Sequence, residues 1–152
     1  MKKLFLITII FIIYLLPSFI FDYNYDYYNA INLPLFSPSP QFFKIVWTIL
    51  YFLISISVAS MIITNPPSAR TRSYYYMVIM NYLLNQSFSF VFFNMQDLFF
   101  AFAVAVFTFI TALYMYSYAY ELNVKASTLL IPYVVWTLLA SMLALNIFVI
   151  NT

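Results

Sequence analysis

The chain has 152 residues, of which 66% are hydrophobic, 23% are aromatic and only 7% are charged. A soluble globule of this size carries about a quarter charged residues, so the composition excludes a soluble domain and predicts a surface that faces lipid. The sequence contains no His, Cys or Gly. It therefore excludes disulfides, thiolate or imidazole metal sites, His-based catalysis and Gly-rich phosphate loops. A net charge of +2 without a basic stripe also excludes a nucleic-acid interface.

Five apolar runs have the length of about 20 residues that a helix needs to cross a hydrocarbon core. They are residues 4–21, 42–63, 74–93, 98–120 and 126–150. No run shows the alternating polarity of membrane barrel strands, and backbone groups in lipid must be satisfied within a helix. The sequence therefore predicts an all-α membrane protein, a bundle of five transmembrane helices in one domain spanning residues 1–152.

The first run follows Lys2 and Lys3, a pattern that also fits a secretory signal. No small-x-small cleavage site follows Pro17, because the first Ala of the chain is Ala30. We therefore expect a retained helix, and either interpretation leaves the other four spans unchanged.

Basic residues between the runs predict the orientation. When five helices are threaded, one side of the membrane receives all but one of the cations: Lys2, Lys3, Arg70, Arg72 and Lys125. The other side receives Lys44, together with Asp22, Asp26 and Asp97. The positive-inside rule then predicts a cytoplasmic amino terminus. An excess of Tyr, Phe, Ile and Asn without Gly suggests an AT-rich genome, and we expect a bacterial plasma membrane.

The longest connection, residues 22–41, is dense in Tyr and contains Pro34, Pro38 and Pro40. An interfacial aromatic belt is one interpretation. Because prolines fix backbone torsions, we favour an ordered lid over the outer mouth of the bundle. Residues 64–73 are expected to form a turn, and the short link 94–97 predicts that the helices on either side of it are antiparallel neighbours.

Polar side chains inside the third run are the main candidates for function, since an unpaired polar group in hydrocarbon is costly. Asn81, Asn85 and Ser89 recur every four residues on one helix face, with Gln86 about 100° around and Phe88 nearby. Such a stripe either joins helices through hydrogen bonds or lines a ligand cavity. The spacing does not decide between the two.

Both tryptophans, Trp47 and Trp136, lie within predicted spans. Core packing is the ordinary role of a single aromatic residue. A buried indole N–H nevertheless needs an acceptor, and an aromatic wall with a fixed donor suits a flat apolar ligand.

Pro132 removes one backbone hydrogen bond from the fifth run and frees the carbonyl of Thr128, so we expect a bend there. Small residues follow at four-residue spacing, as in Ala140 and Ala144. They allow close helix approach, either inside the bundle or at a dimer face.

Three stretches together resemble the TspO/MBR family, the tryptophan-rich sensory proteins related to the mitochondrial translocator protein. The stretch 27–51 (YYNAINLPLFSPSPQFFKIVWTILY) is similar to the family's aromatic, Pro-rich first loop and the start of its second helix. The stretch 81–93 (NYLLNQSFSFVFF) resembles its third helix, and 129–146 (LLIPYVVWTLLASMLALN) resembles its fifth. Together with the five predicted spans, the match covers nearly the whole chain, and the order and spacing of the three motifs make it specific.

The resemblance implies a cavity beneath the first loop that binds flat apolar molecules such as protoporphyrin IX, haem or synthetic benzodiazepine-type ligands. It implies that amides and one indole give polar contacts, namely Trp47, Asn81 and Asn85, with Gln86 as a further candidate. It implies walls formed by Tyr28, Tyr51, Phe88, Trp136 and Ala140. No catalytic residue, metal site or required cofactor is expected, and porphyrin enters as the ligand.

We therefore predict a membrane receptor or sensor for tetrapyrroles. The alternatives are a light-dependent porphyrin-degrading enzyme, a transporter of porphyrin or lipid, and a structural protein without a ligand. No Asp, Glu or Arg lies mid-span, so the usual marks of a proton relay or an ion-coupled carrier are missing. The expected partners are membrane lipid and a small hydrophobic ligand, with homodimerisation left open and nucleic acid excluded.

Overall fold

A computed structural model describes residues 1–20 and 24–152, and in that part of the chain every regular element is helical. The elements are α1 (Lys2–Leu15), α2 (Pro17–Ile20), α3 (Tyr25–Ala30), α4 (Pro40–Thr64), α5 (Ala69–Ser89), the π-helix η1 (Phe90–Asn94), α6 (Leu98–Leu122), α7 (Val124–Thr128) and α8 (Ile131–Ile150). Phe21, Asp22 and Tyr23, and with them the predicted outer placement of Asp22, lie outside the described residues.

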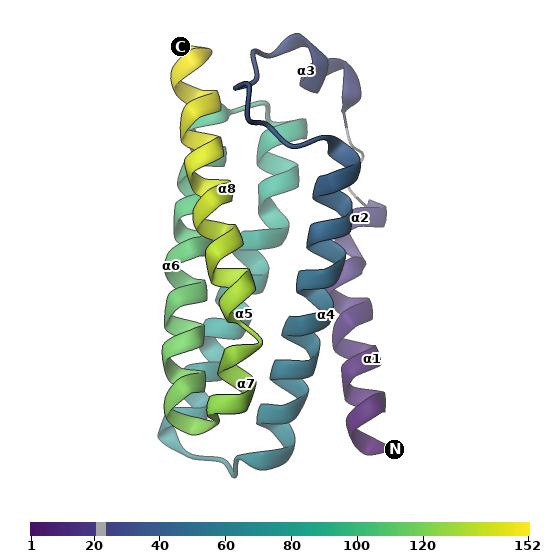
Figure 1. The fold of residues 1–152 in the computed structure, drawn as a ribbon, viewed down its shortest axis with the longest axis vertical. Helices are drawn as coiled ribbons and strands as arrows, with labels where there is room; N and C mark the ends of the chain where they lie inside the picture. The colour runs from purple at the N-terminus through teal and green to yellow at the C-terminus, as the bar shows by residue number, and fades with distance from the viewer. Residues whose placement is uncertain (21–23) are drawn as a thin grey trace.

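The long helices run side by side along one axis, which confirms the predicted all-α bundle (Figure 1). Within the described residues, four segments are long and apolar enough to cross a membrane: Lys2–Phe19, Pro40–Thr64, Leu98–Leu122 and Val124–Ile150. The fifth long helix, α5, lies among them but carries arginines, hydroxyls and amides along its length. Its polar groups therefore have to be satisfied inside the bundle.

The start of α5 corrects the sequence-based boundaries. The predicted turn 64–73 and helix 74–93 are replaced by a short link at 65–68 and a helix that begins at Ala69. A capping box explains the earlier start: the Ser68 hydroxyl accepts from the Thr71 N–H, and the Thr71 hydroxyl accepts from the Ser68 N–H. These reciprocal bonds satisfy backbone donors at the helix terminus, so the helix begins well before the apolar residues do.

Two prolines interrupt the first and last spans. Pro17 has no N–H to donate to the carbonyl of Ile13, and α1 ends just before it, at Leu15. The freed Ile13 carbonyl instead accepts a hydrogen bond from the Tyr82 hydroxyl of α5 at 3.1 Å. A break in α1 thus becomes an attachment point for α5.

Pro132 acts in the same way near the other terminus, and the predicted bend is confirmed as a break between α7 and α8 at residues 129–130. Near this break the Ser57 hydroxyl of α4 donates to the Ala126 carbonyl at 2.8 Å. Both groups are buried, so this bond fastens α7 to α4.

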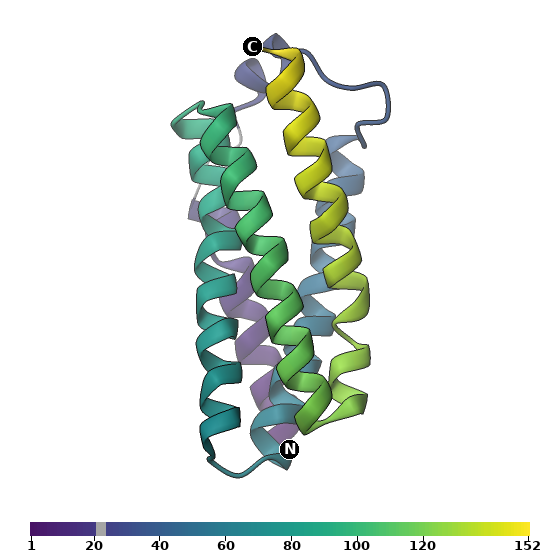
Figure 2. The same cartoon turned by 90° about the vertical axis from the view of Figure 1, so that its left-hand side faces the viewer.

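The helices pack most extensively as α5 against α6, α6 against α8, and α1 against α4. Alanines on α6 permit the close approach, with Ala101, Ala105, Ala112 and Ala119 all buried. α4 and α8 touch each other only sparsely and are joined mainly through α7. Figure 2 shows α6 and α8 close together near α7 and diverging toward the opposite end.

The connection between α1 and α4 is ordered over its described part and crosses the end of the bundle that holds the carboxyl terminus (Figure 1). It contains the short helix α3, which is capped by the Asn24 side chain. Farther on, the Asn32 N–H donates to Asn151 Oδ1 at 2.8 Å, and Asn151 Nδ2 donates to the Asn32 carbonyl at 2.9 Å. This pair ties the connection to the end of α8, as expected for an ordered lid.

Candidate functional site

Asn81 lies at the centre of a polar layer with Thr108, Thr111 and Tyr133, which we call the Asn81 layer. Its Nδ2 donates to the Thr108 carbonyl at 2.9 Å and to Thr111 Oγ1 at 3.0 Å, both on α6. Its Oδ1 accepts from the Tyr133 hydroxyl of α8 at 2.7 Å. Asn81 and Tyr133 are both 0% exposed. The amide therefore joins three helices, and both of its donor hydrogens are used within the protein.

Asn85 lies one helical turn further along the same face of α5 and faces a different pair of helices. Its Nδ2 donates to the Tyr51 hydroxyl of α4 at 3.3 Å, near the long limit for such a bond. Tyr51 packs against Tyr14 of α1, with ring centroids 5.2 Å apart. We call Asn85, Tyr51 and Tyr14 the Asn85 layer. The long Asn85 hydrogen bond joins α5 to α4, and the ring contact between Tyr51 and Tyr14 joins α4 to α1.

Gln86 has a local structural role. Its Nε2 donates to the carbonyl of Tyr14 at 3.2 Å, next to the break that Pro17 makes in α1. Together with the bond from Tyr82 to Ile13, it satisfies backbone groups that the break leaves free. The structure thus places Gln86, a predicted ligand contact, against the end of α1.

Aromatic rings form a continuous wall across α1, α4 and α8. The wall consists of Tyr14, Tyr51, Trp47 and Trp136. Successive ring centroids are 5.2, 5.5 and 6.4 Å apart. Trp136 also contacts Phe42 and Phe43 at the start of α4. The structure therefore brings the predicted residues Trp47, Tyr51, Asn85 and Trp136 together.

Two donors in the aromatic wall lack a partner. Among the described residues, the indole Nε1 of Trp136 and the hydroxyl of Tyr14 are buried without a hydrogen bond. A buried donor left unpaired costs about 1–3 kcal/mol relative to a paired one. Both groups therefore keep a hydrogen-bond donor that no neighbour in the described part of the chain uses.

A hollow of about 420 Å³ opens between α4 and α8, on one side of the aromatic wall. It is lined by Val46, Ile49, Leu50, Leu53, Ile131, Pro132, Val135, Trp136 and Leu139. Among the predicted site residues only Trp136 lines it. Ala140 lies one turn farther along α8 and is half-buried. The hollow opens through the side of the bundle, whereas the family resemblance implied a cavity beneath the first loop.

Tyr28 and Phe88 belong to a second aromatic cluster, near the lid. Phe88 stacks on Phe92 with centroids 5.6 Å apart, and Tyr28 contacts Phe93 at 6.4 Å. Burial raises the pKa of the Tyr28 phenol, which therefore stays neutral. These two predicted wall residues thus pack the lid against the end of α5 and η1, apart from the aromatic wall.

Sequence reasoning missed Tyr14, Tyr133 and the two phenylalanines at the start of α4. Tyr14 is the lone Tyr of the first apolar run, and an isolated phenol in such a run is a signal for a buried polar contact. Tyr133 follows Pro132 directly, but nothing in the sequence indicates that its hydroxyl meets Asn81. That pairing depends on how α5 and α8 are placed around α6.

Comparison with known proteins agrees with this architecture. Residues 5–150 match the TspO/MBR family. The chain is 29% identical over 139 residues to the tryptophan-rich protein TspO of Bacillus cereus, covering 91% of this chain and 90% of that protein. It is 32% identical over 130 residues to the uncharacterized membrane protein YtaB of Bacillus subtilis, covering 86% and 83%. The chain is therefore a multi-pass integral membrane protein that belongs to the TspO/MBR family.

Proposed function

We propose that the protein is a membrane receptor or sensor that binds porphyrin-type and other flat apolar molecules against the aromatic wall. The observation that carries this proposal is the Trp136 indole, whose buried N–H has no partner among the described residues and whose side chain belongs both to the aromatic wall and to the lining of the α4–α8 hollow. Small-molecule sites combine mostly apolar linings with a few fixed polar groups. Trp136 supplies both in one side chain.

The groups around Trp136 favour a flat ligand that carries a hydrogen-bond acceptor. The rings of Trp47 and Trp136 meet nearly at right angles, with an interplanar angle of 86°. A planar ligand stacked on one ring would meet the edge of the other, which is a favourable geometry for aromatic pairs. A carboxylate or carbonyl oxygen of the ligand would accept from Trp136 Nε1 or from the amide of Asn85.

The volume of the hollow, about 420 Å³, fits a small-molecule site. The contact between α4 and α8 is sparse, so separating the two helices here would break few contacts. A ligand inserted here would replace lipid against the exposed faces of Ile49, Val135 and Leu139. The aromatic wall would then be reached without breaking the α5–α6–α8 packing.

The proposal is tested by titrating the purified protein with protoporphyrin IX in the dark and following the Soret band. This readout remains valid when a tryptophan is replaced. We expect saturable binding at micromolar ligand, with an affinity loss of about tenfold in Trp136→Phe, which keeps a ring but removes the N–H donor. Trp136→Leu should lose more. Phe107→Leu, at an exposed position of α6, is the matched control and should bind normally.

Two results would overturn the proposal: absence of saturable binding, or equal affinity of the wild type and Trp136→Phe. Illumination of the same samples then separates binding from catalysis. Bleaching of the porphyrin faster than in a detergent blank would assign the light-dependent enzyme instead. Equal bleaching, with binding intact, supports the receptor.

A further inference from the structure

The end of the bundle that holds the amino terminus is basic. The starts of α1, α5 and α7 and the end of α6 lie at this end (Figure 1). They carry Lys2, Lys3, Arg70, Arg72 and Lys125, and among the described residues Glu121 is the acidic side chain on these segments. A second hollow, of about 540 Å³, lies there between the end of α4 and the start of α5. It is lined by Ile62, Asn65, Pro67, Ser68, Ala69, Thr71, Arg72 and Tyr75.

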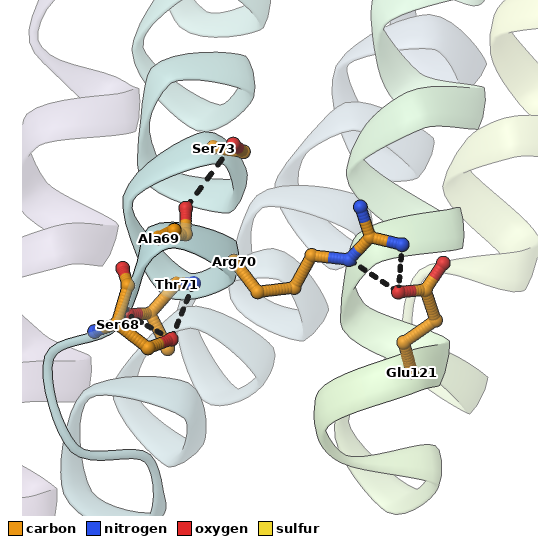
Figure 3. Close-up of polar contacts among 6 residues, drawn as sticks. All are labelled: Ser68, Ala69, Arg70, Thr71, Ser73 and Glu121. Carbon is orange, nitrogen blue, oxygen red and sulfur yellow. Dashed lines mark hydrogen bonds and ion pairs between the residues drawn. The ribbon is translucent and has the colours of Figure 1, made fainter.

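The two arginines of α5 differ in their surroundings. Arg70 extends to α6 and pairs with Glu121 through both Nε and Nη2, as Figure 3 shows. Its guanidinium also lies 5.0 Å from the centroid of the Tyr118 ring. The charge of Arg70 is therefore matched within the protein.

Arg72 lies two residues later, about 200° around the helix, and lines the hollow instead. Within the described part of the chain it makes no ion pair and no side-chain hydrogen bond. A guanidinium on the wall of a hollow, with no carboxylate opposite, is suited to receive an anion. Its planar set of donors matches a phosphate group in particular.

Three other polar side chains of the hollow already make hydrogen bonds within the protein. Ser68 and Thr71 bond to each other in the capping box (Figure 3). Asn65 Nδ2 donates to Thr64 Oγ1 and to the Met61 carbonyl. Arg72 is thus the charged residue in the lining of the hollow, and its guanidinium is left without a partner among the described residues.

The rest of the lining is apolar, with Ile62, Pro67 and the ring of Tyr75 beside the arginine. The hollow lies where α4 ends, so it sits at the level where a spanning helix meets lipid headgroups. A ligand that fits must place an anionic group beside an apolar stem at this depth. A membrane phospholipid has this arrangement.

We propose that this hollow binds the headgroup of an anionic phospholipid, with Arg72 contacting its phosphate and the apolar lining receiving the start of its acyl chains. The site is independent of the aromatic wall. It makes the protein selective for the lipid that surrounds one end of the bundle.

The experiment is native mass spectrometry of the detergent-solubilised full chain, titrated with phosphatidylglycerol or phosphatidylcholine. We expect the wild type to retain phosphatidylglycerol preferentially and Arg72→Gln to lose about fivefold of that preference. Arg70→Gln is the matched control, because it removes the same charge from the same helix but from outside the hollow. It should change the preference by less than about twofold.

A second variant tests the hollow without a change of charge. Ala69→Phe fills it from the start of α5 and should also reduce the preference, whereas loss of folding would show in the helical circular dichroism signal. Equal effects of Arg72→Gln and Arg70→Gln would overturn the proposal in favour of diffuse charge attraction. Complete displacement of the lipid by millimolar glycerol 3-phosphate would overturn it in favour of a soluble-anion site.

Discussion

The Asn81 and Asn85 layers lie one turn apart on α5. Each is built on an asparagine amide, but the two amides differ in how many hydrogen bonds they make. Asn81 makes three hydrogen bonds between 2.7 and 3.0 Å and is completely buried. Asn85 makes one bond of 3.3 Å and keeps 7% of its surface exposed. In lipid, an amide that uses both of its donor hydrogens holds helices together, and an amide with an unused donor is the one we propose as a ligand contact.

The difference arises from the neighbours of the two layers. The Asn81 layer lies within the close packing of α5, α6 and α8, where buried alanines on α6 bring the backbones together. The Asn85 layer faces α4 and α1, and the aromatic wall extends from there to the sparsely packed α4–α8 side. A polar stripe that looks uniform in the sequence is thus divided by packing into a densely bonded half at Asn81 and a sparsely bonded half at Asn85.

The largest effect is expected for Asn81→Leu. The substitution removes three hydrogen bonds and leaves the Tyr133 hydroxyl buried without its acceptor. We expect the free energy of unfolding to fall by about 2–4 kcal/mol. Reversible unfolding in mixed detergent with sodium dodecyl sulfate measures it. A loss below about 1 kcal/mol would remove the distinction between the two layers.

Tyr133→Phe should have the next largest effect, a loss of about 1–2 kcal/mol, because it breaks the shortest bond of the Asn81 layer. In the Asn81→Leu background the same substitution should cost almost nothing, since its partner is already gone. The same unfolding assay gives this coupling. Additive losses would show that the two side chains act separately.

Asn85→Leu should affect ligand binding more than stability, unlike Asn81→Leu. It removes one long bond, so the unfolding free energy should fall by less than about 1 kcal/mol. The affinity for protoporphyrin IX, followed by the Soret band, should fall by about tenfold or more because a ligand acceptor loses its amide donor. Stability loss as large as that of Asn81→Leu, with unchanged affinity, would make both layers structural.

The fold was largely predictable from the sequence because lipid imposes a strong length rule on apolar runs. The errors occur where local chemistry overrides hydropathy. α5 starts at Ala69 because Ser68 and Thr71 cap it, although the apolar pattern begins later. The bend at Pro132 could be foreseen, since a missing N–H acts locally whatever packs around it.

The candidate site was less predictable because it depends on contacts between helices. Spacing alone put Asn81, Asn85 and Gln86 in one group. In the structure, Gln86 instead bonds to the broken end of α1, and Asn81 bonds to α6 and α8. Phe88 and Tyr28 pack in the second aromatic cluster, near the lid. Helix periodicity fixes the face on which a side chain lies, and not which neighbouring helix meets that face.

The smallest effect is expected for Tyr51→Phe, which tests the Asn85 layer from its other side. Phenylalanine keeps the ring contacts with Tyr14 and Trp47 and removes only the hydroxyl that accepts from Asn85. The unfolding free energy should change by less than about 0.5 kcal/mol, because the bond is long. Affinity for protoporphyrin IX should hold or rise slightly, since the Asn85 donor no longer has to leave Tyr51 to meet a ligand. A clear fall in affinity would instead assign the Tyr51 hydroxyl a direct contact with the ligand.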